Sequence, residues 1–164
     1  MKKIFPIILA SGLFLASCSS TKNMNEFYSK YDKEATVIPV PKLALSIAKK
    51  NVGNIKLLDY INSAKIFIIN DASTAKQNRV IKDLQSATRG ENFDQLTKLN
   101  YKKKNLAVSY SENNGKINQL ILGINGLKNV LVIDSKVNLT VAELEEALNT
   151  IDLTDLEGLA NILK

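Results

Sequence analysis

Serine–lysine pairs are the first side chains of this sequence whose types and spacing could do chemistry. A serine three residues before a lysine, as at Ser73 and Lys76, can place an amine beside a hydroxyl and so favour serine acyl transfer. The same spacing recurs at 19–22 and 46–49, which is about what chance gives in a chain rich in both residues. Ser73 also fits the N-cap of a helix, and we adopt that interpretation.

Carboxylates offer a second kind of chemistry. Asp71 and Asp134 each lie at the end of an apolar run, where two carboxylates could act as the acid and base of a glycosidase. Aspartate after a strand is also a common turn former, which is the interpretation we favour. Asp152, Asp155 and Glu157 suit a helix N-terminus, and no D-x-D-x-D-G calcium loop occurs. We therefore assign no catalytic residue and no metal ligand.

The composition excludes whole classes of enzyme. The 164 residues include no His, no Trp and a single Cys. A Ser-His-Asp triad, a Cys-His dyad and any metal site built from histidines or several thiols are therefore impossible within this chain. With 45% hydrophobic and 23% charged residues, the chain has the profile of one ordinary folded domain.

The single thiol, Cys18, lies at the end of an N-terminal targeting signal. Lys2 and Lys3 precede an uncharged run at 4–16, which is too short to span about 30 Å of hydrocarbon as a helix. The sequence Leu15-Ala16-Ser17-Cys18 resembles the lipobox of bacterial lipoprotein precursors. That resemblance implies lipidation of Cys18 after removal of residues 1–17, with 18–25 as a lipidated tether and 26–164 as a single domain.

Acyl chains would place the protein on a membrane, because two or more chains anchor stably. Ser19, rather than aspartate, follows the cysteine, which by analogy with Gram-negative lipoproteins favours the outer membrane. No acidic cluster follows Cys18, so we expect a domain that faces the periplasm. A plain secretory peptide with an incidental cysteine is the alternative.

The charge pattern argues against nucleic acid as a partner. Removing 1–17 leaves 20 basic and 16 acidic side chains, a formal charge of +4, with residues 18–136 at +9 and 137–164 at −5. Only Arg79 and Arg89 are arginine, the better ligand for phosphates and bases. The lysine run at 102–104 is interpreted as a solvated edge.

Hydrophobic periodicity predicts the elements that must position these residues. Helices are expected at 26–33, from Pro41 to about 49, from Ser73 to about Thr88 and at 92–99. Strands are expected at 36–40 and 64–70, the second of them central. In the second helix, an inward stripe is predicted at 43, 44, 47 and 48, and in the helix at 92–99 it is predicted at 93, 96 and 99.

The clearest local signal is a hairpin. Leu106–Ser111 and Lys116–Ile124 flank Asn114-Gly115, which tolerates the positive φ of a type I′ turn. A two-residue turn would set Val108 opposite Ile121 and Ala107 opposite Leu122. A further strand at 129–134 would complete a meander with five apolar side chains on one shared face: Leu120, Leu122, Ile124, Leu131 and Ile133.

Two C-terminal helices share one start signal, because 140–143 and 154–157 both read as capping boxes. These elements together predict an α+β fold. It would be a two-layer domain in which a mixed, mostly antiparallel sheet of four to five strands carries helices mainly on one face.

The order of these segments resembles a known family. The segments are 27–31, 36–49, the Ile66-Phe67-Ile68-Ile69 strand, 93–96, and 106 through the helix capped at Thr140. Together they are similar to the small envelope lipoproteins grouped as domain-of-unknown-function family 4252. The resemblance implies a bacterial cell-envelope lipoprotein that acts in signalling or envelope homeostasis, and it brings no catalytic residues.

We therefore expect a lipid-anchored, non-catalytic binding or regulatory module with an envelope protein as partner and no cofactor. Two alternatives stay open: a carrier of a lipid or small apolar ligand, and an enzyme with an unfamiliar Ser/Lys or carboxylate site. A deep apolar cavity would favour the carrier, and a closed pocket holding a strongly shifted carboxylate or lysine would favour the enzyme.

Overall fold

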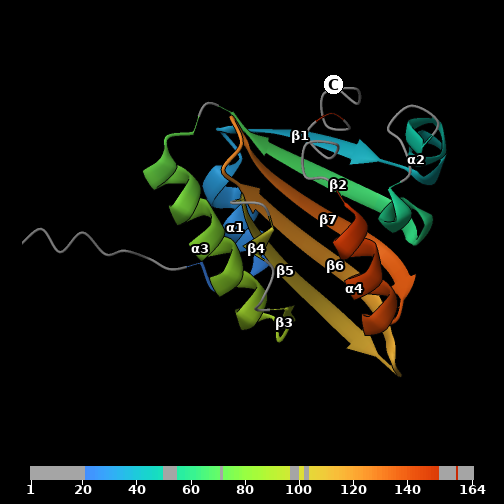
Figure 1. The fold of residues 1–164 in the computed structure, drawn as a ribbon. Coiled ribbons are helices and arrows are strands. Elements are labelled where there is room, and N and C mark those ends of the chain that lie inside the picture. The colour runs from blue at the N-terminus through green and yellow to red at the C-terminus, as the bar shows by residue number, and fades with distance from the viewer. Residues whose placement is uncertain are drawn as a thin grey trace, which may run out of the picture.

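The computed structural model describes residues 21–49, 55–70, 72–96, 100–101, 104–151 and 158. Its helices are α1 (Met24–Tyr31), α2 (Lys42–Lys49), α3 (Thr74–Gly90) and α4 (Val141–Thr150), with one 3-10 turn, η1 (Lys56–Asp59). Its strands are β1 (Ala35–Val40), β2 (Ile61–Ile69), β3 (Asp94–Leu96), β4 (Asn100–Tyr101), β5 (Lys104–Asn113), β6 (Lys116–Asn125) and β7 (Val130–Leu139) (Figure 1).

Local signals place the starts of α3 and α4 where the sequence predicts them, whereas α1 begins two residues earlier than predicted, at Met24. The Ser73 hydroxyl caps α3 by accepting the Lys76 backbone N–H at 3.4 Å. Thr140 and Glu143 form the predicted capping box at the start of α4. The second predicted box, at 154–157, lies outside the described residues. None of the described helices is long and apolar enough to cross a membrane.

A single open sheet runs through the domain in the order β1-β2-β7-β6-β5-β3, with β4 also paired to β5. Every pairing among the described strands is antiparallel. The predicted meander and the predicted strands at 36–40 and 64–70 are all present. The sheet has more strands than the four to five expected, and it is antiparallel rather than mixed.

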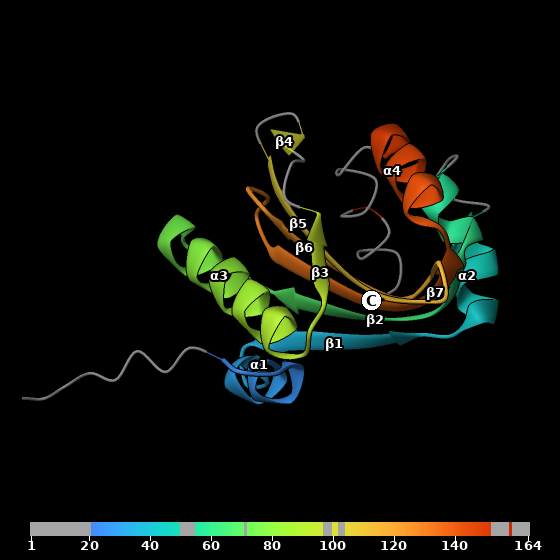
Figure 2. The ribbon, with the colours of Figure 1, turned by 90° about the horizontal axis from the view of Figure 1, so that it is seen from below.

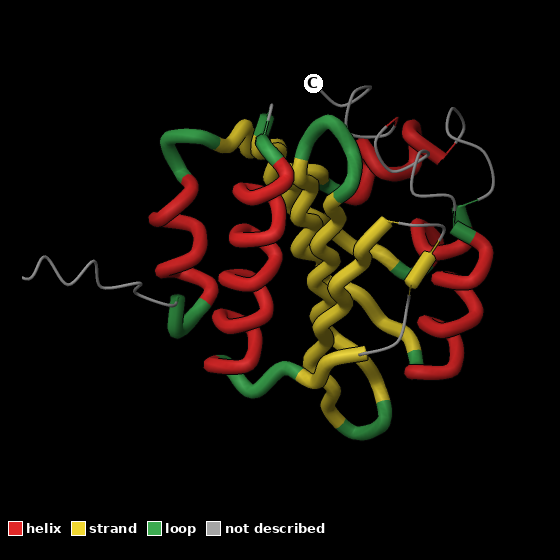
Figure 3. The backbone as a smooth tube through the Cα atoms, turned by 60° about the vertical axis from the view of Figure 1, so that its left-hand side comes forward, coloured by secondary structure: helices red, strands yellow, loops and turns green. Residues whose placement is uncertain are grey.

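The sheet carries helices on both faces, where the sequence predicts helices mainly on one (Figures 2 and 3). Side chains alternate along each strand, so Ile66 and Ile68 join one core cluster while Phe67 and Ile69 join another. β6 and β7 divide their apolar side chains in the same way. Strands that are apolar on both faces must be covered by helices on each side. The domain therefore has three layers, with the sheet between two layers of helices.

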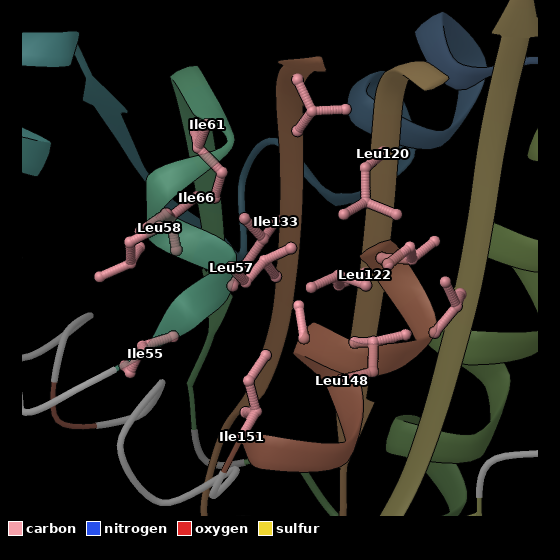
Figure 4. Packing of buried hydrophobic residues seen from close by; sticks show 14 of the residues in the cluster. Ile55, Leu57, Leu58, Ile61, Ile66, Leu120, Leu122, Ile133, Leu148 and Ile151 are labelled. Carbon is pink, nitrogen blue, oxygen red and sulfur yellow. The ribbon is translucent and has the colours of Figure 1, made fainter. Parts of the chain in front are cut away.

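The first core lies between the sheet and η1 and α4. It contains the five side chains predicted to share one face of the meander, and all five are buried. Figure 4 shows Leu57 of η1 beside Ile133 of β7, and Leu148 of α4 below Leu122 of β6. Each large apolar side chain buried here stabilises the fold by roughly 1.5–3 kcal/mol.

The second core lies between the other face and α1 and α3. Phe27 of α1 is fully buried, as are Val80 and Leu84 of α3. They pack against β-strand side chains such as Ile121 and Val132. This cluster fixes α1 beside α3 and gives the sheet its third layer.

The orientation of α2 matches the predicted stripe only in part, since Ala44 packs against the first core as predicted and the side chain of Ala48 is outside the described part of the chain. Leu45 is buried and packs in the first core, whereas Leu43 and Ile47 are 74% and 57% exposed. The helix is too rich in apolar residues for periodicity alone to choose its inner side, and contact with β2 selects Leu45.

The hairpin turn is confirmed, but its register is shifted by one residue. Asn114 and Gly115 have φ of 53° and 76°, as the turn requires. The register then shifts between Ser111 and Glu112, because β6 contributes one extra residue at the bulge. Val108 therefore lies opposite Leu122, not Ile121, and Ala107 lies opposite Gly123, not Leu122.

The prediction of a helix at 92–99 is wrong. Asn92 has φ of 60° and turns the chain after α3, and 94–96 form β3 beside β5. Phe93 lies between this turn and β3 and is buried in the second core, so its side chain packs there without belonging to a helix. Leu99 lies outside the described residues.

Candidate functional site

The second-core face of the sheet extends beyond the cover of α1 and α3 and carries polar side chains there. In register, Pro39 of β1 lies opposite Lys65 of β2, which lies opposite Asp134 of β7. Two residues further along β7, on the same face, Lys136 lies opposite Gln119 of β6. Pro39, Lys65 and Lys136 are exposed, while Asp134 and Gln119 are half-buried. With Val37 of β1, these residues form what we call the open face.

The centre of the open face is a carboxylate held from two sides. The Tyr28 hydroxyl of α1 donates to Asp134 Oδ2 at 2.6 Å. Gln119 Nε2 donates to Asp134 Oδ1 at 2.9 Å. Each carboxylate oxygen thus accepts one hydrogen bond, which fixes the orientation of the Asp134 side chain on the sheet.

An aromatic pair borders this centre. The Tyr28 ring stacks on Phe67 of β2 with 4.4 Å between ring centroids and 11° between planes. Lys65 Nζ lies 5.1 Å from the Tyr28 centroid and 5.8 Å from the Phe67 centroid, within cation–π range of both rings. The stack and the hydrogen bond together join α1 to β2 and β7 at the edge of the open face.

The electrostatics keep Tyr28 protonated. Burial raises the pKa of the Tyr28 phenol well above its usual value of 10.0, and the charge of Asp134 and the hydrogen bond to it raise it further. A protonated phenol donates a hydrogen bond and is neither a base nor a nucleophile at neutral pH. The phenol can therefore keep its hydrogen bond to the Asp134 carboxylate throughout the neutral pH range.

A second polar junction lies between α1 and α3, away from the open face. Asp83 is buried and accepts from the Tyr31 hydroxyl at 2.6 Å and from Lys30 Nζ at 2.7 Å. Burial and the hydrogen bond to Asp83 raise the pKa of the Tyr31 phenol. The Thr21 hydroxyl donates to the backbone carbonyl of Asp83 at 2.6 Å. These contacts are sufficient to explain the junction as a structural one.

Ser73 and Lys76, both of whose side chains are described, do not form a reactive pair. Ser73 acts as the cap of α3, and Lys76 Nζ forms an ion pair with the Glu34 carboxylate. At the spacing 46–49, the Ser46 hydroxyl donates to the Leu43 carbonyl at 2.7 Å, as it does within a helical turn. The cap interpretation of Ser73 is therefore confirmed.

Other residues singled out from the sequence fall outside the described part of the chain. Cys18 and Asp71 are two of them, so the spacing of Asp71 from Asp134 is not defined. The acids at 152–157, the serine–lysine spacing at 19–22 and Lys102 and Lys103 are outside it as well. Among the described residues, no three His, Cys, Asp or Glu side chains gather as a metal site would require.

The interpretation of Asp134 as a turn former is wrong, because β7 continues to Leu139 and Asp134 lies within it, opposite Lys65 and Ile121. Sequence reasoning also missed the hydrogen-bond partners of Asp134. Tyr28 is adjacent to the apolar residue Phe27 in a short helix, and nothing local indicates that it reaches β7. A signal was present in the strands, since Lys65 directly precedes the apolar run at 66–69 and Lys136 follows the apolar run at 130–133. Polar residues at such positions indicate a stretch of sheet that no helix covers.

The fold and the open face define a small α+β domain, an antiparallel sheet between two helical layers with part of one face exposed. The chain belongs to the DUF4252 family, a domain of unknown function whose model matches residues 27–147. Comparison with curated proteins and with solved structures found no match.

Proposed function

We propose that the protein is a lipid-anchored, non-catalytic interaction module of the bacterial cell envelope. In this proposal Cys18 carries the lipid, and the domain projects from the outer membrane into the periplasm. The open face binds a protein partner. The observation that carries the proposal is the fixed Tyr28–Asp134–Gln119 centre beside exposed Lys65 and Lys136.

A fixed surface favours recognition, because little side-chain entropy is lost when a partner binds to groups that are already held. Asp134 is fixed by two hydrogen bonds, and Tyr28 by its stack on Phe67. Lys65 and Lys136 add charge that would select a partner and speed its approach. The exposed Val37 and Pro39 extend the surface with apolar area.

The anchor has its own test. Metabolic labelling with an alkyne-bearing fatty acid should mark the wild-type chain, and Cys18→Ala should abolish the label and release the domain from membranes. Labelling or membrane retention that survives Cys18→Ala would exclude the lipid at this residue.

The open face is tested by site-specific crosslinking in intact cells. A photoreactive phenylalanine replaces Lys136 or Lys65 on the open face, and Lys82 on α3 as the matched exposed control. We expect a discrete protein adduct from the first two positions and none from Lys82. Equal adducts at all three positions, or adducts at Lys82 alone, would contradict a partner on the open face.

A further inference from the structure

Strand β1 forms one end of the sheet (Figure 1). It pairs with β2 from Ala35↔Ile69 to Val40↔Ala64, and no other described strand pairs with its second side. Within the described part of the chain, an extended strand could therefore pair with the backbone N–H and C=O groups on that side.

Natural edge strands are protected from edge-to-edge association by several devices, among which are charged side chains and proline. The six residues of β1, ATVIPV, carry no charge, and Val37 is 40% exposed. Pro39 is the one residue of β1 that limits pairing, because it lacks an N–H. Proline in an edge strand turns its nitrogen toward solvent, so Ala35 and Val37, at even spacing from it, also turn their N–H groups outward.

These outward groups are self-complementary. When two β1 strands run antiparallel with Val37 opposite Val37 of the second copy, the two valines can exchange a pair of N–H···O bonds. The Ala35 N–H of each copy then faces the Pro39 carbonyl of the other. Because Pro39 has no N–H, one hydrogen bond is missing at each end of the pair: the Ala35 carbonyl of one copy has no donor from Pro39 of the other.

Charged side chains flank β1 outside the strand. Asp32 and Lys33 lie in the turn before it, Lys42 begins α2 after it, and all three are exposed. An antiparallel pair brings the turn that carries Asp32 near the end of the other copy where Lys42 lies, so the two can attract one another there. Glu34, nearer the strand, is already paired with Lys76. The two-fold symmetry repeats this arrangement at both ends and closes the assembly.

We infer that β1 pairs with β1 of a second copy of this chain, so that the two sheets join into one continuous antiparallel sheet centred on Val37. A dimer of this kind places two open faces side by side. Its geometry does not depend on the lipid or on the partner proposed above. Confinement on a membrane would raise the local concentration of copies and favour it.

The register is tested by disulfide trapping in the full chain carrying Cys18→Ala, which leaves the introduced cysteine as the only thiol. Val37→Cys should give a covalent dimer under mild oxidation, since position 37 faces its own symmetry mate. Thr36→Cys is the matched control on the same strand, because its mate lies two rows away, beyond the roughly 7 Å Cα separation that a disulfide spans. Dimers at equal yield from both variants, or none from Val37→Cys, would overturn the inference.

The interface is tested by sedimentation with Val37→Lys, which adds the charge that natural edges carry. We expect the apparent mass to fall from that of two chains to that of one. Leu43→Lys, which also removes an exposed apolar side chain but lies on α2, should leave the dimer intact. A monomer in the wild type, or a dimer lost only with Leu43→Lys, would refute pairing through β1. Circular dichroism confirms that each variant is folded.

Discussion

The Tyr28 hydroxyl and the Asp134 carboxylate, 106 residues apart in the chain, are joined by a 2.6 Å hydrogen bond. The bond links the first helix to the last strand, and Gln119 holds the second oxygen of the same carboxylate. The edge of the open face is thus built from α1, β6 and β7, and its shape depends on all three being in place.

Tyr28→Phe should lower the free energy of unfolding by about 1–2 kcal/mol, because it removes a hydrogen bond to a charged group while keeping the stack on Phe67. Urea denaturation measures the change. Tyr110→Phe is the control, since no hydrogen bond joins the Tyr110 hydroxyl to a described residue, and it should stay within about 0.5 kcal/mol. Equal losses from both variants would show that the Tyr28–Asp134 bond contributes nothing.

Stability should fall steeply above pH 10. Burial raises the pKa of Tyr28 and of Tyr31 in the folded state above the 10.0 of an unfolded tyrosine. Below pH 10 both states are protonated and the stabilisation is complete. Above it the unfolded chain loses protons first, so each tyrosine lowers stability by at most about 1.4 kcal/mol per pH unit. Denaturation at pH 8–11 measures this slope, which Tyr28→Phe and Tyr31→Phe should each reduce. If the slope is unchanged in either variant, the replaced tyrosine does not contribute to the loss of stability above pH 10.

Gly90→Ala should destabilise the protein by about 1–3 kcal/mol although alanine favours helices by roughly 1 kcal/mol over glycine. A Cβ at position 90 would overlap the backbone carbonyl of Lys22, so either that segment or the end of α3 must move. Thermal unfolding measures the loss. Lys82→Ala, exposed on the same helix, serves as the control and should be near neutral. If Gly90→Ala stabilised the protein, the backbone at Lys22 would have to move aside without lowering the free energy of unfolding.

Replacing Asn114-Gly115 by Ala-Ala should lower stability by about 2 kcal/mol and the Tm by roughly 4–8 °C. Both residues have positive φ, and a Cβ on Gly115 would meet no atom within 4 Å, so the cost is one of backbone conformation rather than of space. Glu112→Ala, exposed on the adjoining strand, is the control. An unaltered Tm in the double variant would show that the turn adapts without strain.

Local signals were sufficient to predict much of the fold. The caps at Ser73 and Thr140 and the turn at Asn114-Gly115 depend on a few neighbouring residues, and all three are confirmed. The shared apolar face of the meander followed from alternation alone. The register of the hairpin did not, because the bulge in β6 adds one residue that the turn type cannot reveal.

Tertiary contacts decided the remaining features. Leu43 and Ile47 lie outward because α2 uses Leu45 against the core, a choice that helical periodicity leaves open. The second helical layer follows from apolar residues on both faces of β2, β6 and β7. These residues are visible in the sequence, but the prediction of two layers covered only one face of the sheet. The site around Asp134 required knowing that α1 lies over β2, and no residue near Tyr28 carries that information.

The burial of Thr21 and the close approach of Lys22 to Gly90 hold the start of the described chain against the body of the domain. Residues 21–25, assigned by the sequence to the tether, belong to the fold, and α1 already begins at Met24. With Cys18 acylated as proposed, only about 14 Å of extended chain separates the lipid from Lys22. The domain would therefore stay close to the headgroups with restricted tumbling, so a partner on another membrane would have to cross most of the intervening space itself.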